Sequence, residues 1–155
     1  MKEIRWHARA GQGAKSASQM LAVALLHSGK SVQAFPEYGP ERRGAPLRAF
    51  TRYDDVPIRR HDAVTTPDAV VVLEPSLLHE PSVTEGLKEG GILLDAESLG
   101  APRESTNLFM TGALAKALGE PPLETLQDAA VELLGRKLDP AAIRAAVAAG
   151  YEAQA

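Results

Sequence analysis

The sequence of 155 residues contains no cysteine. This absence excludes disulfide bonds, thiolate catalysis, thiolate zinc sites and ligation of an iron–sulfur cluster by this chain. Long apolar runs are also missing. None approaches the roughly 20 residues that a membrane-spanning helix needs, and the first eleven residues lack the apolar block of a secretory signal. We therefore expect a cytoplasmic protein with no membrane contact.

An excess of positive charge is likewise absent, because 17 lysines and arginines face 20 acidic residues and the formal net charge is -3. Such a chain is not expected to bind nucleic acid. The four histidines are spaced neither as metal ligands nor beside a nucleophile, so we predict no metal site and no catalytic residue. The length and an apolar fraction of 45% suit one core, which predicts a single domain over residues 1–155.

The pattern of apolar residues predicts a β-α-β unit at the start of the chain. Residues 3–7 alternate apolar and charged side chains as a strand does, and the spacing from Ala14 to Ser28 predicts a helix that Gly29 ends. Residues 31–35 form a second strand, parallel to the first, after a right-handed crossover. A third strand at 47–53 is expected to turn back at Asp54-Asp55 toward residues 57–60 as a hairpin.

The later elements complete an α/β fold. The expected elements are buried strands at 69–73 and 91–94, a helical piece at 82–89 between them, and helices at 107–118, 123–134 and 140–151. Asp139 is the expected N-cap of the last helix. The fold class is therefore three layers, α/β/α, with a mostly parallel, mixed, Rossmann-like sheet and a helical C-terminal third.

A glycine loop follows the first strand, within HARAGQGAKSASQ from His7 to Gln19. The N-terminus of the next helix offers free N–H groups to an anion, so the candidate binding residues are Gly11, Gln12, Gly13, Ala14 and Ser16. Ser16 stands where a dinucleotide fingerprint has its third glycine, and a nucleotide triphosphate loop would need a GK[ST] ending. Spacing alone leaves two alternatives open, an anion site or a plain strand-to-helix turn.

Arginines gather in the proline- and glycine-rich stretch that follows. Arg42 and Arg43 lie between Pro40 and Gly44-Ala45-Pro46 in a stiff loop suited to phosphate or carboxylate. The other arginines of this region, Arg48 and Arg52 on the expected hairpin, are predicted to point into solvent. His7 is expected to be a core or edge histidine. Asp95 is expected to cap the turn after its strand, and Glu97 is expected to cap this turn or to begin it.

Four segments carry a resemblance to a known family. In chain order they are EIRWHARAGQGAKSASQMLA, QAFPEYGPERRGAPLRAFTR, TEGLKEGGILL and TNLFMTGALAKALG. Together they resemble the γ subunit, or γ domain, of the 2-oxoacid:ferredoxin oxidoreductases, and most closely the pyruvate type. The resemblance implies a complex that converts pyruvate, coenzyme A and oxidised ferredoxin to acetyl-CoA, CO2 and reduced ferredoxin. Branched-chain 2-oxo acids are the second candidate class of substrate.

The resemblance also implies how the work is divided among subunits. Thiamine diphosphate and the iron–sulfur clusters belong to partner subunits, ferredoxin is contacted only indirectly, and this chain is inactive alone. Its expected share is assembly and, as a hypothesis, binding of coenzyme A phosphates by the glycine loop with Arg42 and Arg43 at a shared site. The alternative is a stand-alone or minimised α/β binding or oligomerisation module that catalyses nothing and forms a homo-oligomer when isolated.

Two departures from the family pattern bear on these expectations. Ala8 stands where the family usually has glycine, and its Cβ could tighten the ligand site. The family also has a further strand and helix where this chain has only a short stretch between Leu99 and Thr106. The chain is therefore expected to be shortened at that point.

Overall fold

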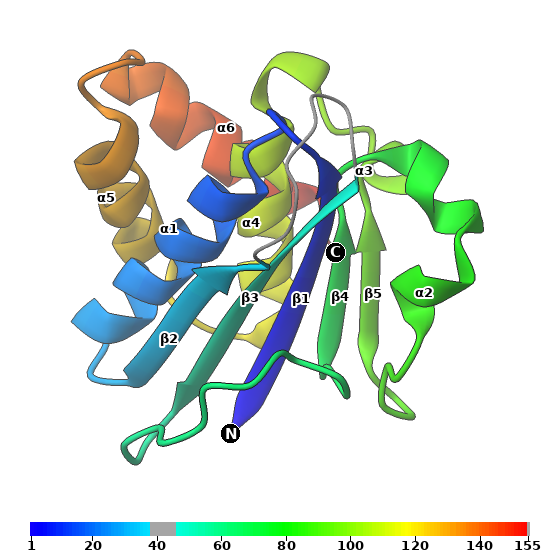
Figure 1. Cartoon of the computed structure of the whole chain (residues 1–155). Coiled ribbons are helices and arrows are strands. Elements are labelled where there is room, and N and C mark those ends of the chain that lie inside the picture. The colour runs from blue at the N-terminus through cyan, green and yellow to red at the C-terminus, as the bar shows by residue number, and fades with distance from the viewer. Residues whose placement is uncertain (38–45, 155) are drawn as a thin grey trace.

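The protein is built on a five-stranded mixed sheet with the strand order β2-β3-β1-β4-β5 (Figure 1). The computed structural model describes residues 1–37 and 46–154. The strands are β1 Lys2–Arg9, β2 Ser31–Pro36, β3 Pro46–Asp54, β4 Ala69–Val72 and β5 Ile92–Asp95. The pairings of β3 with β1 and β2 are antiparallel and the others are parallel, so β3 alone runs against the other four strands. The predicted fold class is confirmed.

The position of β3 corrects two expectations. β1 and β2 do run in the same direction, but they are not neighbours, because β3 lies between them and pairs with both. The hairpin is therefore formed by β2 and β3, and residues 57–60 form no strand. At the end of β3 the Asp54 carboxylate accepts a hydrogen bond from the Asp55 N–H at 2.7 Å, so Asp54-Asp55 ends the strand without returning it into the sheet.

Four longer helices cover one face of the sheet. They are α1 Ala14–His27, α4 Thr106–Leu118, α5 Leu123–Leu134 and α6 Pro140–Ala153. All four predictions of helix are confirmed to within a few residues, and Asp139 caps α6 by accepting from the Ala142 N–H at 3.3 Å. The main core lies between this layer and the sheet, where Trp6, Met20 and Leu114 are fully buried.

The opposite face of the sheet is covered by shorter elements, the 3₁₀ helix η1 Pro75–His79 and α2 Pro81–Thr84. Val70 and Val72 of β4 pack there with Leu77 and Val83, whereas Val71 belongs to the main core. This double packing explains why β4 is apolar at every position. The helical piece expected at 82–89 is wrong in its extent, because Gly86 has φ +78° and packs against the Thr65 backbone.

The outward orientation predicted for Arg52 is also wrong. Arg52 is 0% exposed, and its Nε donates to Glu3 Oε2 at 2.7 Å. Its Nη1 donates to Gln33 Oε1 at 2.9 Å, which satisfies a second guanidinium donor. Arg48 is half-buried and pairs with Glu37 through two hydrogen bonds. The sequence pattern does not reveal the burial of Arg52, because its partners Glu3 and Gln33 come from the two neighbouring strands.

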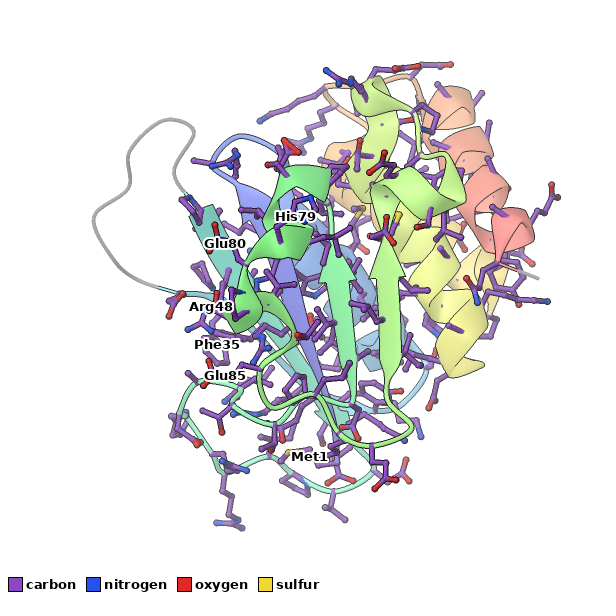
Figure 2. All side chains as sticks on the ribbon, turned by 90° about the vertical axis from the view of Figure 1, so that its right-hand side faces the viewer. Met1, Phe35, Arg48, His79, Glu80 and Glu85 are labelled. Atoms are coloured by element: carbon purple, nitrogen blue, oxygen red, sulfur yellow. The ribbon has the colours of Figure 1, made fainter. Side chains whose placement is uncertain are left out.

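This polar face lies away from α1 (Figure 2). Figure 2 shows Phe35, Arg48 and Glu85 along one side of it, with Met1 at one end of the sheet and His79 and Glu80 toward the other.

Among the residues that the structure describes, no helix is long and apolar enough to cross a membrane. Within the same part of the chain, no group of three or more histidine or acidic side chains could hold a metal ion.

Candidate functional site

The candidate site lies at the carboxyl ends of β1, β4 and β5. From β1 the chain passes through α1 to β2 on one side of the sheet, and from β4 it passes through η1 and α2 to β5 on the other side. β1 and β4 are neighbours, so the connections diverge between them. Open α/β sheets bind ligands in the crevice at such a switch point.

The glycine loop between β1 and α1 forms one wall of this crevice. Gly11 and Gly13 have φ values of +92° and +83°, which only glycine adopts without strain. The Gln12 N–H donates to the Arg9 carbonyl at 3.1 Å and closes the turn. Gly13 is the N-cap of α1 and provides no side chain to cap it, so the first N–H groups of the helix are available to an acceptor from outside.

A cavity of about 620 Å³ opens beside the loop. Its walls come from Gly11, Gln12 and Gly13, from residues 73–75 after β4, from Ala96 and Glu97 after β5, and from the connection between Ala101 and Asn107. Ala96 and Glu97 belong to the short helix α3 Ala96–Leu99, and the connection includes the short helix η2 Arg103–Ser105. Three parts of the chain that are far apart in the sequence, residues 11–13, 73–75 and 96–107, therefore meet at one cavity.

The beginning of α4 packs directly on the glycine loop. A Cβ atom at Gly13 would lie 2.5 Å from Nδ2 of Asn107, so only glycine leaves this amide in place. Thr106 and Asn107 form the first turn of α4 and line the cavity. The N-cap of α4, Ser105, makes no side-chain capping bond. The N-termini of two helices of at least 13 residues, α1 and α4, therefore border the same cavity.

A ring of hydrogen bonds joins the glycine loop to the segment after β4. The Arg9 N–H donates to Gln12 Oε1 at 2.6 Å, and Gln12 Nε2 donates to Glu74 Oε1 at 3.2 Å. The other carboxylate oxygen of Glu74 accepts from the Ser76 N–H at 3.3 Å. Arg9 Nη2 donates to the Ser76 hydroxyl at 3.1 Å and closes the ring. This ring fixes the wall of the cavity at the switch point.

The charged groups around the cavity are mainly acidic. Among the described lining residues, Glu74, Glu97 and Glu104 bring three carboxylates against the single guanidinium of Arg103. The described part of the cavity therefore combines helix N-termini, which favour anions, with carboxylates, which repel them.

The structure brings together part of the predicted site. Gly11, Gln12 and Gly13 line the cavity. Ala14 is buried and Ser16 half-buried in the first turn of α1, and neither is among the described lining residues. The predicted residues Arg42 and Arg43 lie outside the described residues.

Sequence reasoning missed other residues of the cavity. Glu74 and Asn107 lie far from the glycine loop in the sequence, although the position of Glu74 just after the AVVVL run was a usable signal. The expected capping role is confirmed for Asp95, which accepts from the Ser98 N–H at 2.8 Å. Glu97 lies in the first turn of α3, as expected, and it also lines the cavity.

Ala8 does not obstruct the cavity. It lies within β1 opposite Leu47, and its side chain is fully buried in the main core on the α1 side of the sheet. No described residue other than glycine has a positive φ, so the Cβ of Ala8 causes no backbone strain. The departure from the family pattern at this position is accommodated by the core.

His7 is a core histidine, as expected. Its Nε2 accepts a hydrogen bond from Arg5 Nε at 2.9 Å. Burial, followed by the positive charges of Arg5 and Arg48, lowers the pKa of His7 to about 3. Arg5 Nη2 in turn donates to the carbonyls of Val83 at 3.0 Å and Glu85 at 2.6 Å. The pair therefore anchors the residues around α2 to β1 and leaves His7 neutral near pH 7.

The comparisons with known proteins agree on one family. Residues 3–105 match the family described as pyruvate ferredoxin/flavodoxin oxidoreductase. The pyruvate synthase subunit PorC of Thermotoga maritima is 45% identical over 179 aligned positions, which cover 97% of this chain and 93% of the relative. The common subunit gamma of the pyruvate/ketoisovalerate oxidoreductases of Thermococcus kodakarensis is 47% identical over 161 positions, covering 85% of this chain and 86% of the relative.

Solved structures agree with the sequence relatives. The crystal structure of the pyruvate oxidoreductase subunit PORC of T. maritima matches with a TM-score of 0.82 and 40% identity, over 97% of this chain and 95% of that chain. A structure of the 2-oxoglutarate:ferredoxin oxidoreductase of Magnetococcus marinus, with 2-oxoglutarate, coenzyme A and succinyl-CoA bound, shares the fold. Its TM-score is 0.71 at 16% identity, over 97% of this chain and 30% of that one.

These findings identify the family of the chain and, within that family, its subunit type. The chain belongs to the pyruvate ferredoxin/flavodoxin oxidoreductase family. Within this family it is a γ-type subunit of a multi-subunit oxidoreductase complex. The alignment with the T. maritima relative spans 179 positions, more than the 155 residues of this chain, so the relative has residues without a counterpart here. This agrees with the expectation that the chain is shortened, whereas the place of the shortening, between Leu99 and Thr106, stays a prediction.

Proposed function

We propose that this γ-type subunit acts in the oxidative decarboxylation of pyruvate with coenzyme A and ferredoxin. The identity of 45% to a pyruvate synthase subunit over nearly the whole chain supports pyruvate as the substrate. Another relative is the common subunit gamma of pyruvate/ketoisovalerate oxidoreductases, so branched-chain 2-oxo acids are the next candidate substrates. Without cysteine the chain has no thiolate for an iron–sulfur cluster. In this proposal the partner subunits carry the clusters and thiamine diphosphate, and this chain is inactive alone.

The contribution that we propose for this chain is one side of the coenzyme A site. The observation that carries the proposal is the cavity at the switch point, which the glycine loop and the first turn of α4 line together. The free N–H groups at the start of α1 can donate to a phosphate oxygen, and Arg42 and Arg43 are the proposed additional phosphate ligands. The M. marinus protein that shares the fold was solved with coenzyme A.

A titration of the assembled complex with coenzyme A tests this role, using two glycines in matched backbone conformations. Gly13 and Gly29 have φ values of +83° and +90°, so an alanine strains the backbone similarly at both positions. At Gly13 the new methyl group also displaces Asn107 in the cavity, whereas at Gly29 it meets no atom within 4 Å. Loss of one or two hydrogen bonds corresponds to about 10-fold weaker binding for Gly13→Ala, and Gly29→Ala is expected to match the wild type.

The same titration includes Arg42→Ala and Arg43→Ala. We expect each variant to bind coenzyme A more weakly, because each loses a charged donor to phosphate. Equal affinities for the wild type, the Gly13→Ala variant and both arginine variants would reject a coenzyme A site on this chain.

A further inference from the structure

We propose that Glu74 is a specificity-determining residue of the cavity. Its carboxylate accepts a hydrogen bond from an N–H or O–H group in an uncharged part of the ligand and keeps phosphate groups away from this wall. This inference rests on the proposed coenzyme A site and adds to it a statement of which part of the ligand lies where.

The position of the Glu74 carboxylate is set by the hydrogen-bond ring. One carboxylate oxygen accepts from Gln12 Nε2 and the other from the Ser76 N–H. Gln12 is itself fixed by the Arg9 N–H. A carboxylate has about four acceptor positions, so two remain for a ligand after these bonds are made. Glu74 therefore presents a fixed acceptor on the wall of the cavity.

The charges of the described wall decide which ligand group suits this acceptor. Glu74 lines the cavity together with Glu97 and Glu104, against one guanidinium, that of Arg103. A phosphate offers only acceptors and negative charge, so it would be repelled next to Glu74. A neutral group with a donor would form a charge-assisted hydrogen bond there. The wall at Glu74 consequently favours hydrogen-bond donors over phosphates.

Coenzyme A offers both kinds of group that such a cavity needs. Its phosphates suit the N–H groups at the helix N-termini. Two uncharged parts have donors that suit Glu74, the amides and hydroxyl of the pantetheine arm and the amino and hydroxyl groups of adenosine. The shared chemistry is a neutral N–H or O–H donor, and separate probes distinguish the two sources.

The test uses the assembled complex and measures competition of pyrophosphate, pantetheine and adenosine against bound coenzyme A. Glu74→Gln removes the charge but keeps an oxygen acceptor. The matched control, Glu80→Gln, removes one charge from an exposed carboxylate that makes no capping bond and is not among the described lining residues. Gln12→Ala opens the ring and leaves the Glu74 charge in place. Thermal unfolding of each variant verifies that it is folded.

The expected result is a change in selectivity that only Glu74→Gln produces. Loss of one nearby negative charge should strengthen pyrophosphate binding by about 5-fold. Loss of a charge-assisted bond should weaken binding of either pantetheine or adenosine by about 5-fold, and the probe affected identifies the part of the ligand that meets Glu74. Gln12→Ala should weaken all probes in parallel.

Two results would overturn the inference. One is an unchanged ratio of pyrophosphate to neutral-probe affinity in Glu74→Gln, as in Glu80→Gln. The other is a Gln12→Ala variant that changes this ratio as much as Glu74→Gln does. Both outcomes leave the proposed function standing if coenzyme A still binds. A wild-type complex that binds neither coenzyme A nor any probe would instead reject the proposed function itself.

Discussion

At the scale of single residues, the buried pair of Arg52 and Glu3 ties the central strands together. The two charges lie 2.7 Å apart, and Gln33 and the Ala63 carbonyl satisfy further guanidinium donors. Removing one partner leaves an uncompensated buried charge, so Arg52→Met should lower the free energy of unfolding by about 3–5 kcal/mol. Urea denaturation measures this loss.

The double variant Glu3→Gln with Arg52→Met is the internal control for this prediction. It removes both charges, so it should be more stable than Arg52→Met alone. A single variant as stable as the wild type would show that the pair contributes nothing.

The burial of His7 predicts that the free energy of unfolding falls as the pH is lowered. Its pKa is about 3 in the folded protein, well below the ordinary value of 6.5, because it is buried beside two arginines. The unfolded chain therefore binds more protons between these values. The contribution of His7 to the free energy of unfolding is complete above pH 6.5. It falls by about 1.4 kcal/mol per pH unit as the pH drops from 6.5 toward 3.

Urea denaturation at pH 4.5, 5.5 and 6.5 checks the pH dependence of the wild type against His7→Gln. The carboxylates titrate in both proteins, so their effects cancel in the difference. The variant should lose less stability on acidification than the wild type. Parallel curves for the wild type and His7→Gln would contradict the assignment of a neutral, buried His7.

At the scale of elements, α4 and α6 cross where each has a glycine. A Cβ at Gly150 would lie 1.7 Å from the Phe109 carbonyl oxygen, and one at Gly112 would lie 2.1 Å from the Val147 carbonyl oxygen. These contacts involve backbone atoms on both sides, so no side-chain rotation can relieve them. The glycines therefore set how closely the two helices approach.

Gly150→Ala should destabilise the protein although alanine is the better helix former. The intrinsic preference favours alanine by about 1 kcal/mol, but overpacking at the crossing should cost more, for a net loss of about 1–3 kcal/mol. The control Ala149→Val adds atoms on the exposed side of α6 and should cost about 0.5 kcal/mol. Thermal denaturation distinguishes the two. A stabilised Gly150→Ala variant would contradict the close crossing.

Elements with a strong local pattern could be predicted from the sequence. The helices 14–27, 123–134 and 140–153 have a clear apolar face and recognisable ends, and β4 and β5 are short apolar runs. The insertion of β3 between β1 and β2 could not be predicted, because local alternation indicates a strand but not its neighbours. The buried Arg52 escaped prediction for the same reason, since its partner Glu3 comes from another strand.

The candidate site was predictable only where its signal is local. The glycine loop can be identified from the sequence because Gly11 and Gly13 stand between a strand and a helix. Glu74 has a weak local signal in its position after the AVVVL run, but Glu74 and Asn107 meet the loop through the order of the strands and the packing of α4. No spacing rule links them to the loop. The acidic character of the cavity therefore became visible only in the folded molecule.

At the scale of the whole molecule, this γ-type subunit lacks residues that the T. maritima relative has, and it forms a cavity at the switch point. The connection from β5 to α4 is short, and it brings Arg103 and Glu104 to the cavity. β5 is the last strand of the sheet on that side, and Leu93 on it is 44% exposed. Among the described residues β5 is therefore an edge strand, and the switch-point cavity is formed beside it.

The central claim is that the chain works as a γ subunit of a pyruvate:ferredoxin oxidoreductase and supplies no redox cofactor itself. The most direct test is purification of the tagged chain from its native host, with assays of co-purifying subunits, thiamine diphosphate, iron, and reduction of ferredoxin dependent on pyruvate and coenzyme A. We predict an active complex with both cofactors, and neither cofactor nor activity in the isolated chain. A chain that purifies alone as a stable homo-oligomer, or that contains stoichiometric iron or thiamine diphosphate by itself, would contradict the claim.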